Sequence, residues 1–226
     1  MVVIVCWNYN KDLFMAKTKP FEEHSDKYEN WFVKNKFTYE SELDAVKMLL
    51  PENGQGLEIG VGSGIFAGPL GIKTGIEPAA GMRKIARVKG ISVVSAVAEA
   101  IPFADSRFDF ALMVTTICFL DFLETALKEA YRVIKPNGFL IIGLVDRNSP
   151  LGRSYLKHRN ESLFYKIATF YSVDEVVSNM EKAGFSDFSF VQTIFHSLRD
   201  IREIEPVNQG YGNGSFVVIR ATKQPS

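Results

Sequence analysis

The spacing of apolar residues divides the chain near residue 51. Across residues 21–50, apolar and aromatic side chains recur at close to the helical period, and the run 51–54, Pro-Glu-Asn-Gly, ends this helical region. Beyond it, short apolar runs alternate with amphipathic stretches. Strands that alternate with helices of this length predict an α/β protein with a parallel sheet covered by helices on both faces.

Seven apolar runs after residue 54 are predicted as strands. Between them the pattern predicts helices over 81–89 and 121–134, and a further helix that begins at the capping box of Ser172 and Glu175 and ends at Gly184. The glycine-rich turn after the first run is expected to lead into another short helix. The seven runs cover residues 56–60, 72–77, 91–95, 108–114, 139–145, 188–195 and 215–222.

Composition and charge exclude several classes of protein. The 26 Lys and Arg side chains balance 26 Asp and Glu side chains, which removes the electrostatic case for a general nucleic-acid binder. Two cysteines, Cys6 and Cys118, make no disulfide framework, and the three histidines show no zinc spacing. The apolar start, 1–7, is too short for a signal peptide or a membrane span. We therefore expect a cytoplasmic protein that does not bind membranes.

The residues that follow the predicted strands carry the candidate chemistry, because ligands of open α/β sheets bind at the carboxyl ends of the strands. Gly60, Gly62 and Gly64 follow the first strand and remove Cβ atoms where a ligand must approach the backbone. Glu77 ends the second strand, where a carboxylate can accept both hydroxyls of a ribose. The glycines are equally compatible with a simple tight turn, and Glu77 with an acid at a helix N-terminus.

Five motifs in this order resemble the class I S-adenosylmethionine-dependent methyltransferases, specifically the type 11 family of small-molecule enzymes. The resemblance is strong over residues 54–145 and says little about the methyl acceptor. The motifs are Glu-Ile-Gly-Val-Gly-Ser-Gly at 58–64, Gly-Ile-Glu-Pro at 75–78, Ala-Glu-Ala-Ile-Pro-Phe at 98–103, Phe-Asp at 108–109 and Glu-Ala-Tyr-Arg-Val-Ile-Lys-Pro-Asn-Gly at 129–138.

For the fold, the resemblance implies a doubly wound, seven-stranded, mostly parallel sheet whose last strand is antiparallel. A helical N-terminal extension, residues 1–20, would precede a single domain over 21–226. Within that domain, 54–145 would form the cofactor-binding core, and 146–171 and 203–214 would be insertions on the acceptor side.

For the site, the resemblance implies S-adenosyl-L-methionine as the methyl donor, S-adenosyl-L-homocysteine as the product, and no metal. Glu77 would hold the ribose, Glu58 the amino group, and Thr115 would lie beside the sulfonium. Relatives often carry Asp where this chain has Val97, and Gly where it has Asn137. The predicted cofactor-binding residues are Tyr28, Glu58, Gly60, Gly62, Gly64, Glu77, Pro78, Ala98, Glu99 and Thr115.

The acceptor is expected to be a small molecule methylated on nitrogen or oxygen. Asp146, Glu203 and Glu205 could attract an amine, but they are equally compatible with solvated surface acids. Residues 115–120, Thr-Thr-Ile-Cys-Phe-Leu, lack the Asn/Asp-Pro-Pro-aromatic run of DNA and RNA amino methyltransferases. His158 and His196 are candidate bases that are equally compatible with surface positions. The predicted acceptor-side residues are Trp31, Thr116, Asp146, Arg147, Glu203, Glu205 and Tyr211.

Two other functions remain open at this point. A nicotinamide-dependent oxidoreductase would use a similar sheet, but its fingerprint is Gly-x-Gly-x-x-Gly, whereas the glycines here are spaced Gly-x-Gly-x-Gly and Ile65 follows. A non-catalytic S-adenosylmethionine-binding subunit would keep the same glycines and Glu77. The chain is expected to be a monomer or a homodimer.

Overall fold

The computed structural model describes residues 17–225. The predictions made for Cys6, for the apolar start 1–7 and for most of the extension 1–20 concern residues outside this range. No helix in the described part of the chain is long and apolar enough to cross a membrane.

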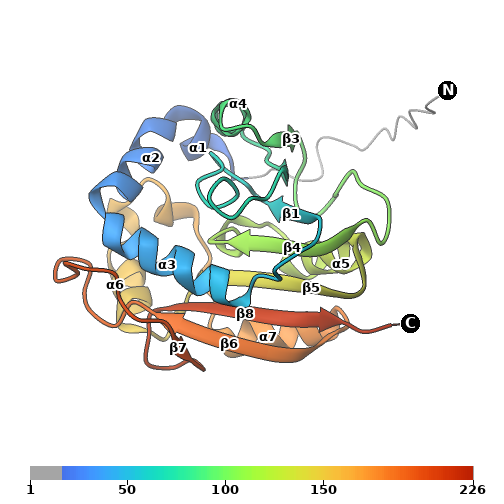
Figure 1. The fold of residues 1–226 in the computed structure, drawn as a ribbon. Helices are drawn as coiled ribbons and strands as arrows, with labels where there is room; N and C mark the ends of the chain where they lie inside the picture. The colour runs from blue at the N-terminus through green and yellow to red at the C-terminus, as the bar shows by residue number, and fades with distance from the viewer. Residues whose placement is uncertain (1–16, 226) are drawn as a thin grey trace.

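The described range begins with three helices and ends with three strands, and between them helices and strands are interspersed, as Figure 1 shows. The α-helices are α1 Lys19–Glu23, α2 Ser25–Lys34, α3 Lys36–Leu49, α4 Ala80–Val88, α5 Leu123–Val133, α6 Pro150–Lys157 and α7 Val173–Lys182. The strands are β1 Gly56–Ile59, β2 Thr74–Ile76, β3 Ser92–Val94, β4 Phe108–Val114, β5 Ile134–Val145, β6 Phe185–Thr193, β7 Asn208–Gln209 and β8 Phe216–Lys223. Short 3₁₀-helices lie at η1 Ile117–Phe119, η2 Arg159–Glu161 and η3 Tyr165–Ile167.

The strands form one mixed sheet in the order β3-β2-β1-β4-β5-β8-β6-β7. The pairs from β3 to β5 are parallel, and β8 runs antiparallel to both β5 and β6. The predicted doubly wound fold with an antiparallel last strand is therefore confirmed. Strand β7 adds a two-residue eighth strand beside Val191 and Gln192 of β6, and so short a polar piece gives no apolar period from which to predict it.

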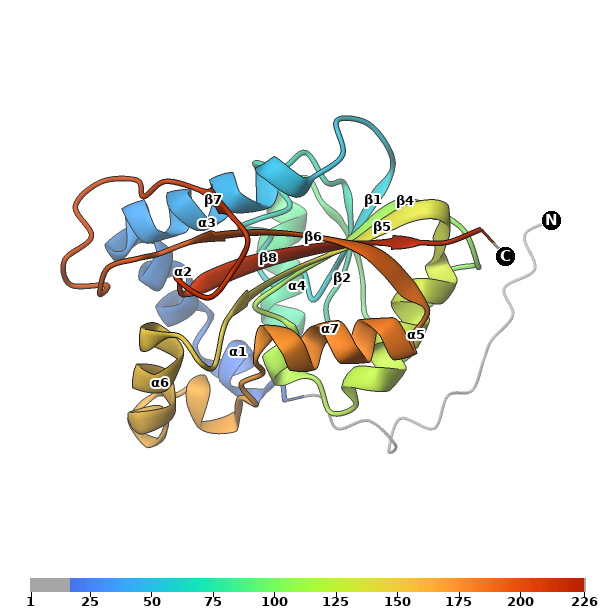
Figure 2. The same ribbon diagram turned by 90° about the horizontal axis from the view of Figure 1, so that it is seen from below.

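Alternating side chains of the central strands build a core on each face of the sheet. In β8, Val217 and Ile219 belong to one apolar cluster, and Phe216 and Val218 belong to the other. The first cluster is covered by α5 and α7, and the second by α3 together with Ala86 of α4. Figure 2 shows α3 on one side of the sheet and α5 and α7 on the other. Burial on both faces explains why these strands appear as continuous apolar runs in the sequence.

The helical region predicted for 21–50 is confirmed and consists of α1, α2 and α3. Two other local expectations need correction. The segment 62–71 forms successive turns instead of the expected short helix, because glycines in the left-handed region interrupt it. Residues 135–138, which link the predicted helix 121–134 to the predicted strand 139–145, belong to β5, where Asn137 has a φ of 62° and the pairing register with β4 shifts.

Candidate active site

The turn after β1 brings bare backbone to the carboxyl end of the sheet. Gly60 and Gly62 have φ values of 71° and 53°, in the region that favours glycine. A Cβ on Gly60 would lie 2.4 Å from Cγ2 of Thr116, so no side chain fits there. A Cβ on Gly62 would lie 3.5 Å from the hydroxyl of Tyr28. Gly60 therefore lets the turn pack against Thr116 after β4, and Gly62 leaves a narrow space toward Tyr28 of α2.

Glu77, at the end of β2, is tied directly to the glycine turn. One carboxylate oxygen accepts the backbone N–H of Gly62 at 3.0 Å, and the other accepts that of Ala79 at 2.8 Å. The side chain is buried, and burial raises its pKa against the opposing effect of these two N–H groups. Each oxygen can still accept one further hydrogen bond, which suits a neighbouring pair of hydroxyls.

A cavity opens above this turn, here called the glycine-turn cavity. It holds about 730 Å³ of space, part of it open to solvent. Its lining brings together nine residues predicted as site residues, namely Tyr28, Gly60, Gly62, Glu77, Pro78, Ala98, Glu99, Thr115 and Thr116. The other lining residues are Lys17, Thr18, Phe21, Ala96, Val97, Val114, Phe119, Leu120 and Asp121.

Two predicted cofactor residues lie beside this cavity without lining it. Glu58, in β1, is 2% exposed, and burial holds the pKa of its carboxyl well above the usual range. Its Oε2 has no hydrogen-bond partner in the described structure. A Cβ on Gly64 would lie 2.3 Å from Cδ1 of Ile91, so this glycine allows the turn to pack against the segment that precedes β3.

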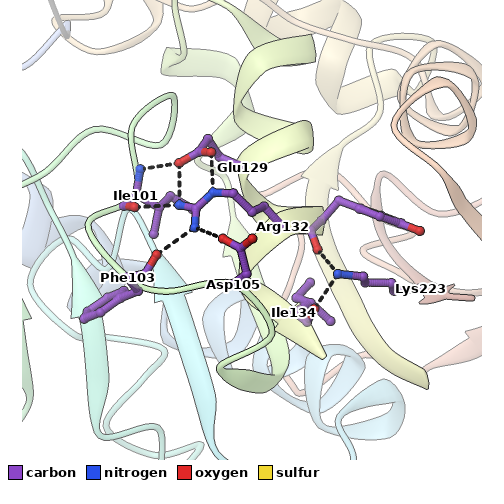
Figure 3. A network of polar contacts seen from close by, with 8 residues as sticks. Ile101, Phe103, Asp105, Glu129, Arg132, Ile134 and Lys223 are labelled. Carbon is purple, nitrogen blue, oxygen red and sulfur yellow. Dashed lines mark hydrogen bonds and ion pairs between the residues drawn. The ribbon is translucent and has the colours of Figure 1, made fainter. Parts of the chain in front are cut away.

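The loop that borders the cavity at Ala98 and Glu99 is held by α5. Figure 3 shows Arg132 at the centre of this network. Its guanidinium donates to the carbonyl oxygens of Ile101 and Phe103 at 2.8 and 2.7 Å and pairs with Glu129 and Asp105. Glu129 also accepts the backbone N–H of Ile101. Two residues of the motif at 129–138, Glu129 and Arg132, thus hold this loop in place by hydrogen bonds.

A second cavity adjoins the first and is strongly aromatic; it is called the aromatic cavity below. It holds about 1040 Å³, again including its opening, and shares Phe21, Tyr28, Thr115 and Phe119 with the glycine-turn cavity. Its remaining lining residues are Lys27, Trp31, Phe32, Glu42, Phe66, Ile117, Cys118, Leu144, Val145, Tyr155, Ser162, Phe164, Tyr165, Phe170 and Tyr171.

Segments far apart in the sequence form the walls of the aromatic cavity. Phe164 lies 5.1 Å from Phe21 and 6.1 Å from Tyr28, measured between ring centroids, which joins α1 and α2 to the segment after α6. Tyr155 of α6 and Tyr165 of η3 lie with ring centroids 4.2 Å apart. Of the predicted acceptor-side residues, Trp31 lines this cavity, and Thr116 lines the glycine-turn cavity.

Thr115 stands at the junction of the two cavities in an unusual backbone conformation. Its φ is 50°, although it is a β-branched residue. Such a conformation costs about 1–3 kcal/mol and persists only where the surroundings enforce it. Here the backbone N–H donates to Gly143 at 2.8 Å. The strain lies where a ligand in one cavity would meet a ligand in the other.

Glu42 is the one buried acid in the aromatic cavity within the described range. Its side chain is 4% exposed, and burial alone raises its pKa to about 8. Among residues 17–225 no donor or cation is paired with its carboxylate. Sequence reasoning missed this residue. The available signal was an acid on the same helical face as Ala45, Val46 and Leu49, which are all buried.

The other predicted acceptor-side residues line neither cavity. Arg147 pairs with Glu175 at 2.9 Å, and the hydroxyl of Tyr211 donates to Asp174 at 3.0 Å. Glu203 is exposed.

The two remaining acids on that side are engaged with other groups. Asp146 accepts the backbone N–H of Asn148 at 3.0 Å, and Glu205 pairs with the ring of His196. His158 and His196 are both exposed. No cluster of three or more His, Cys, Asp or Glu side chains suited to a metal occurs in residues 17–225.

Comparisons with known proteins identify the family. Residues 57–142 match the family model described as "Methyltransferase domain", of type 11. A crystal structure from Thermotoga maritima, described as a SAM-dependent methyltransferase and possible histamine N-methyltransferase, is 54% identical, covers 91% of this chain and 99% of its own, and superimposes with a TM-score of 0.89. An uncharacterized protein of Methanocaldococcus jannaschii is 42% identical over 90% of this chain and 98% of its own length.

A shorter match reaches a curated enzyme with a named acceptor. The mitochondrial 2-methoxy-6-polyprenyl-1,4-benzoquinol methylase of Xenopus laevis is 40% identical over 75 residues, which is 31% of this chain and 24% of that enzyme. These matches remove the nicotinamide-dependent alternative. The chain belongs to the S-adenosylmethionine-dependent methyltransferases, in the type 11 family.

Proposed function

We propose that this enzyme methylates a nitrogen of a small amine that carries an aromatic or apolar body. The observation that best supports this proposal is that the two cavities lie next to each other. The glycine-turn cavity offers polar backbone and a carboxylate, whereas the aromatic cavity offers apolar surface and one buried acid. They meet at Tyr28, Thr115 and Phe119, so a donor and an acceptor bound side by side would face each other there.

The residues of the glycine-turn cavity suit S-adenosylmethionine. Glu77 has one free acceptor site on each oxygen for the ribose hydroxyls. The absence of a Cβ at Gly62 leaves room beside the backbone, and Gly60 lets the turn pack closely against Thr116. Ala98 and Glu99 would border the adenine, and Val97 offers it no side-chain hydrogen bond. Glu58 has an unpartnered oxygen below the turn, but it would reach the amino group only through the turn or a water.

S-adenosylmethionine, when bound, supplies a methyl group on a positively charged sulfonium, which is already a good leaving group. The protein therefore has mainly to orient the acceptor and exclude water, and orientation alone is worth about 7–11 kcal/mol of barrier. Tyr28 and Phe119 present aromatic rings at the junction, where they would also stabilise a cation.

The amine assignment draws on the walls of the aromatic cavity and on one relative. Eleven of its nineteen lining residues are aromatic, and Glu42 is its buried acid. The Thermotoga maritima relative, described as a possible histamine N-methyltransferase, is 54% identical. We assign the acceptor side to 146–171, which contributes Tyr155, Phe164 and Tyr165 to the walls. The segment 203–214 lines neither cavity, so its acceptor role stays a sequence prediction.

The proposal is tested by two measurements on the full chain. Calorimetry with S-adenosylhomocysteine measures donor-side binding, and a radiolabelled methyl-transfer assay compares amines, alcohols and carboxylic acids as acceptors. We expect binding of S-adenosylhomocysteine and transfer to at least one amine. Transfer only to alcohols or carboxylates would refute the amine assignment. Binding without transfer to any acceptor would favour a non-catalytic binding subunit.

A further inference from the structure

Glu42 occupies an energetically costly position that the fold itself does not explain. It lies on the buried face of α3, 4% exposed, and lines the aromatic cavity. A buried carboxylate without a partner costs several kcal/mol when ionised. Most buried acids in proteins are paired with a cation or fully hydrogen-bonded. Glu42 has neither kind of partner in the described structure.

The surroundings of Glu42 leave space for a cation from outside the protein. The single cationic side chain among the described residues that line the cavity is Lys27, which is exposed and not paired with Glu42. The groups close enough to interact electrostatically with Glu42 include Tyr28, Tyr155 and Tyr165. Burial raises the pKa of each of these three hydroxyls, so the tyrosines remain neutral at physiological pH.

Aromatic walls strengthen the preference for a cation. A positively charged nitrogen gains about 0.5–2 kcal/mol over the face of a Tyr or Trp ring, most where water is excluded. The cavity holds about 1040 Å³ including its opening, which accommodates a small organic molecule. Tyr28 lines both cavities and interacts electrostatically with Glu42, so the acid lies on the acceptor side of the junction.

We propose that Glu42 recognises the protonated nitrogen of the methyl acceptor and takes up its proton before transfer, which frees the lone pair that attacks the methyl group, and that the aromatic cavity selects cationic amines with an aromatic or apolar body over neutral molecules of the same shape. This inference rests on the proposed function for its biological meaning. The binding it describes can be measured without the methyl donor.

Binding of an amine beside Glu42 should release a proton. With a pKa of about 8, the Glu42 carboxyl is roughly nine-tenths protonated at pH 7 in the free protein. A bound ammonium stabilises the carboxylate, so binding releases close to one proton to the buffer. The same count holds when the amine binds neutral beside the protonated acid, because the amine then loses the proton. If Glu42 does not contact the amine it keeps its proton, and an amine that binds as an ammonium then releases none.

The experiment measures binding by calorimetry at pH 7 in buffers of different ionisation enthalpy. The probes are 2-phenylethylamine, tryptamine and histamine, each compared with the alcohol of the same carbon skeleton. The variants are wild type, Glu42→Gln and the matched control Glu40→Gln, which removes the same charge from the same helix outside the cavity. Glu42→Met provides a second, apolar replacement, and thermal unfolding at pH 6 checks that every variant is folded.

For wild type and Glu40→Gln, we expect at least one amine to bind tenfold or more tightly than its alcohol, with release of close to one proton. Both the preference and the proton release should disappear in Glu42→Gln and Glu42→Met. Equal binding of every amine and its alcohol to wild type, or an unchanged amine preference in Glu42→Gln, would overturn the inference.

The two proposals fail in distinguishable ways. Methyl transfer to neutral acceptors at equal rates in wild type and Glu42→Gln would remove the role of Glu42 and leave the methyltransferase intact. Failure to bind S-adenosylhomocysteine would remove the proposed donor site, while the amine-binding result would stand by itself.

Discussion

Ionisation of Glu42 in the empty cavity should make folding stability depend on pH. Burial raises the pKa of this carboxyl from 4.5 to about 8. Below pH 4.5 the acid is protonated in both the folded and the unfolded chain. Between pH 4.5 and 8 the unfolded chain is ionised while the folded protein keeps its proton, so the free energy of unfolding falls as pH rises and levels off above pH 8.

The size of this effect follows from the two pKa values. Each pKa unit corresponds to about 1.36 kcal/mol, so a difference of about 3.5 in pKa lowers the stability by up to about 5 kcal/mol. A domain of ordinary stability has only about 5–15 kcal/mol in total. Glu42→Gln keeps the volume of the side chain and removes the ionisation. The variant should therefore gain stability over wild type steadily from pH 5 to pH 8.

The assay is urea denaturation of wild type, Glu42→Gln and the control Glu40→Gln at several pH values in this range. Glu58 and Glu77 also have raised pKa values, but they titrate in all three proteins and cancel in the differences. A difference between Glu42→Gln and wild type that stays constant from pH 5 to pH 8 would show that burial does not hold Glu42 protonated. A saturating concentration of an amine ligand should reduce the difference in the free energy of unfolding between Glu42→Gln and wild type.

Substitutions at Glu77, Gly60 and Tyr28, each compared with wild type or a control variant, test the glycine-turn cavity. Glu77→Gln replaces one carboxylate oxygen by an NH₂ group, which cannot accept the backbone N–H of Gly62 or Ala79. The affinity for S-adenosylhomocysteine, measured by calorimetry, should therefore fall at least tenfold, which corresponds to about 1.4 kcal/mol. Gly60→Ala and Gly71→Ala each place Ala at nearly the same positive φ, at a cost of about 1 kcal/mol. A Cβ at position 60 also collides with Thr116, whereas a Cβ at position 71 contacts nothing. Only Gly60→Ala should therefore lose S-adenosylhomocysteine binding, and equal losses in both variants would rule out the role of this close contact. Tyr28→Ala should weaken that binding more than it lowers the melting temperature, whereas Tyr28→Phe should preserve both, since the hydroxyl has no hydrogen-bond partner in the described structure.

The sheet could be predicted from the sequence because its strands carry their own local signals. The central parts of β4 and β8, residues 110–114 and 216–219, are buried on both faces, so each is a continuous apolar run bounded by polar residues. The helix α7 has a capping box at Ser172 and Glu175, with both reciprocal hydrogen bonds formed. These features depend on neighbours within a few residues, which a single sequence displays directly.

The missed features depend on contacts between distant segments. The segment 62–71 is rich in glycine, and its left-handed turn packs Gly64 against Ile91, where a Cβ on Gly64 would lie 2.3 Å from Cδ1 of Ile91. Strand β7 exists because Asn208 and Gln209 pair with β6. Glu42 looks like an ordinary helical acid until α2, α6 and η3 close the aromatic cavity around it.

The donor side of the site could be predicted from the sequence, whereas the acceptor side depends on contacts between distant segments. The donor side is built from residues that directly follow β1, β2 and β4, so the topology of the sheet brings them together and sequence motifs can reveal them. The acceptor side is built from α1, α2 and α3 before the sheet and from 150–171 after β5, which meet through aromatic contacts such as Phe21 with Phe164. Apart from Phe21 and Tyr28, which line both cavities, the helices and the segment 150–171 lie outside the donor site. Substitutions among their other residues can therefore alter the acceptor while Glu77 and the glycine turn stay unchanged. Acceptor identity should therefore be sought in the side chains of the aromatic cavity, with Glu42 as the first to change.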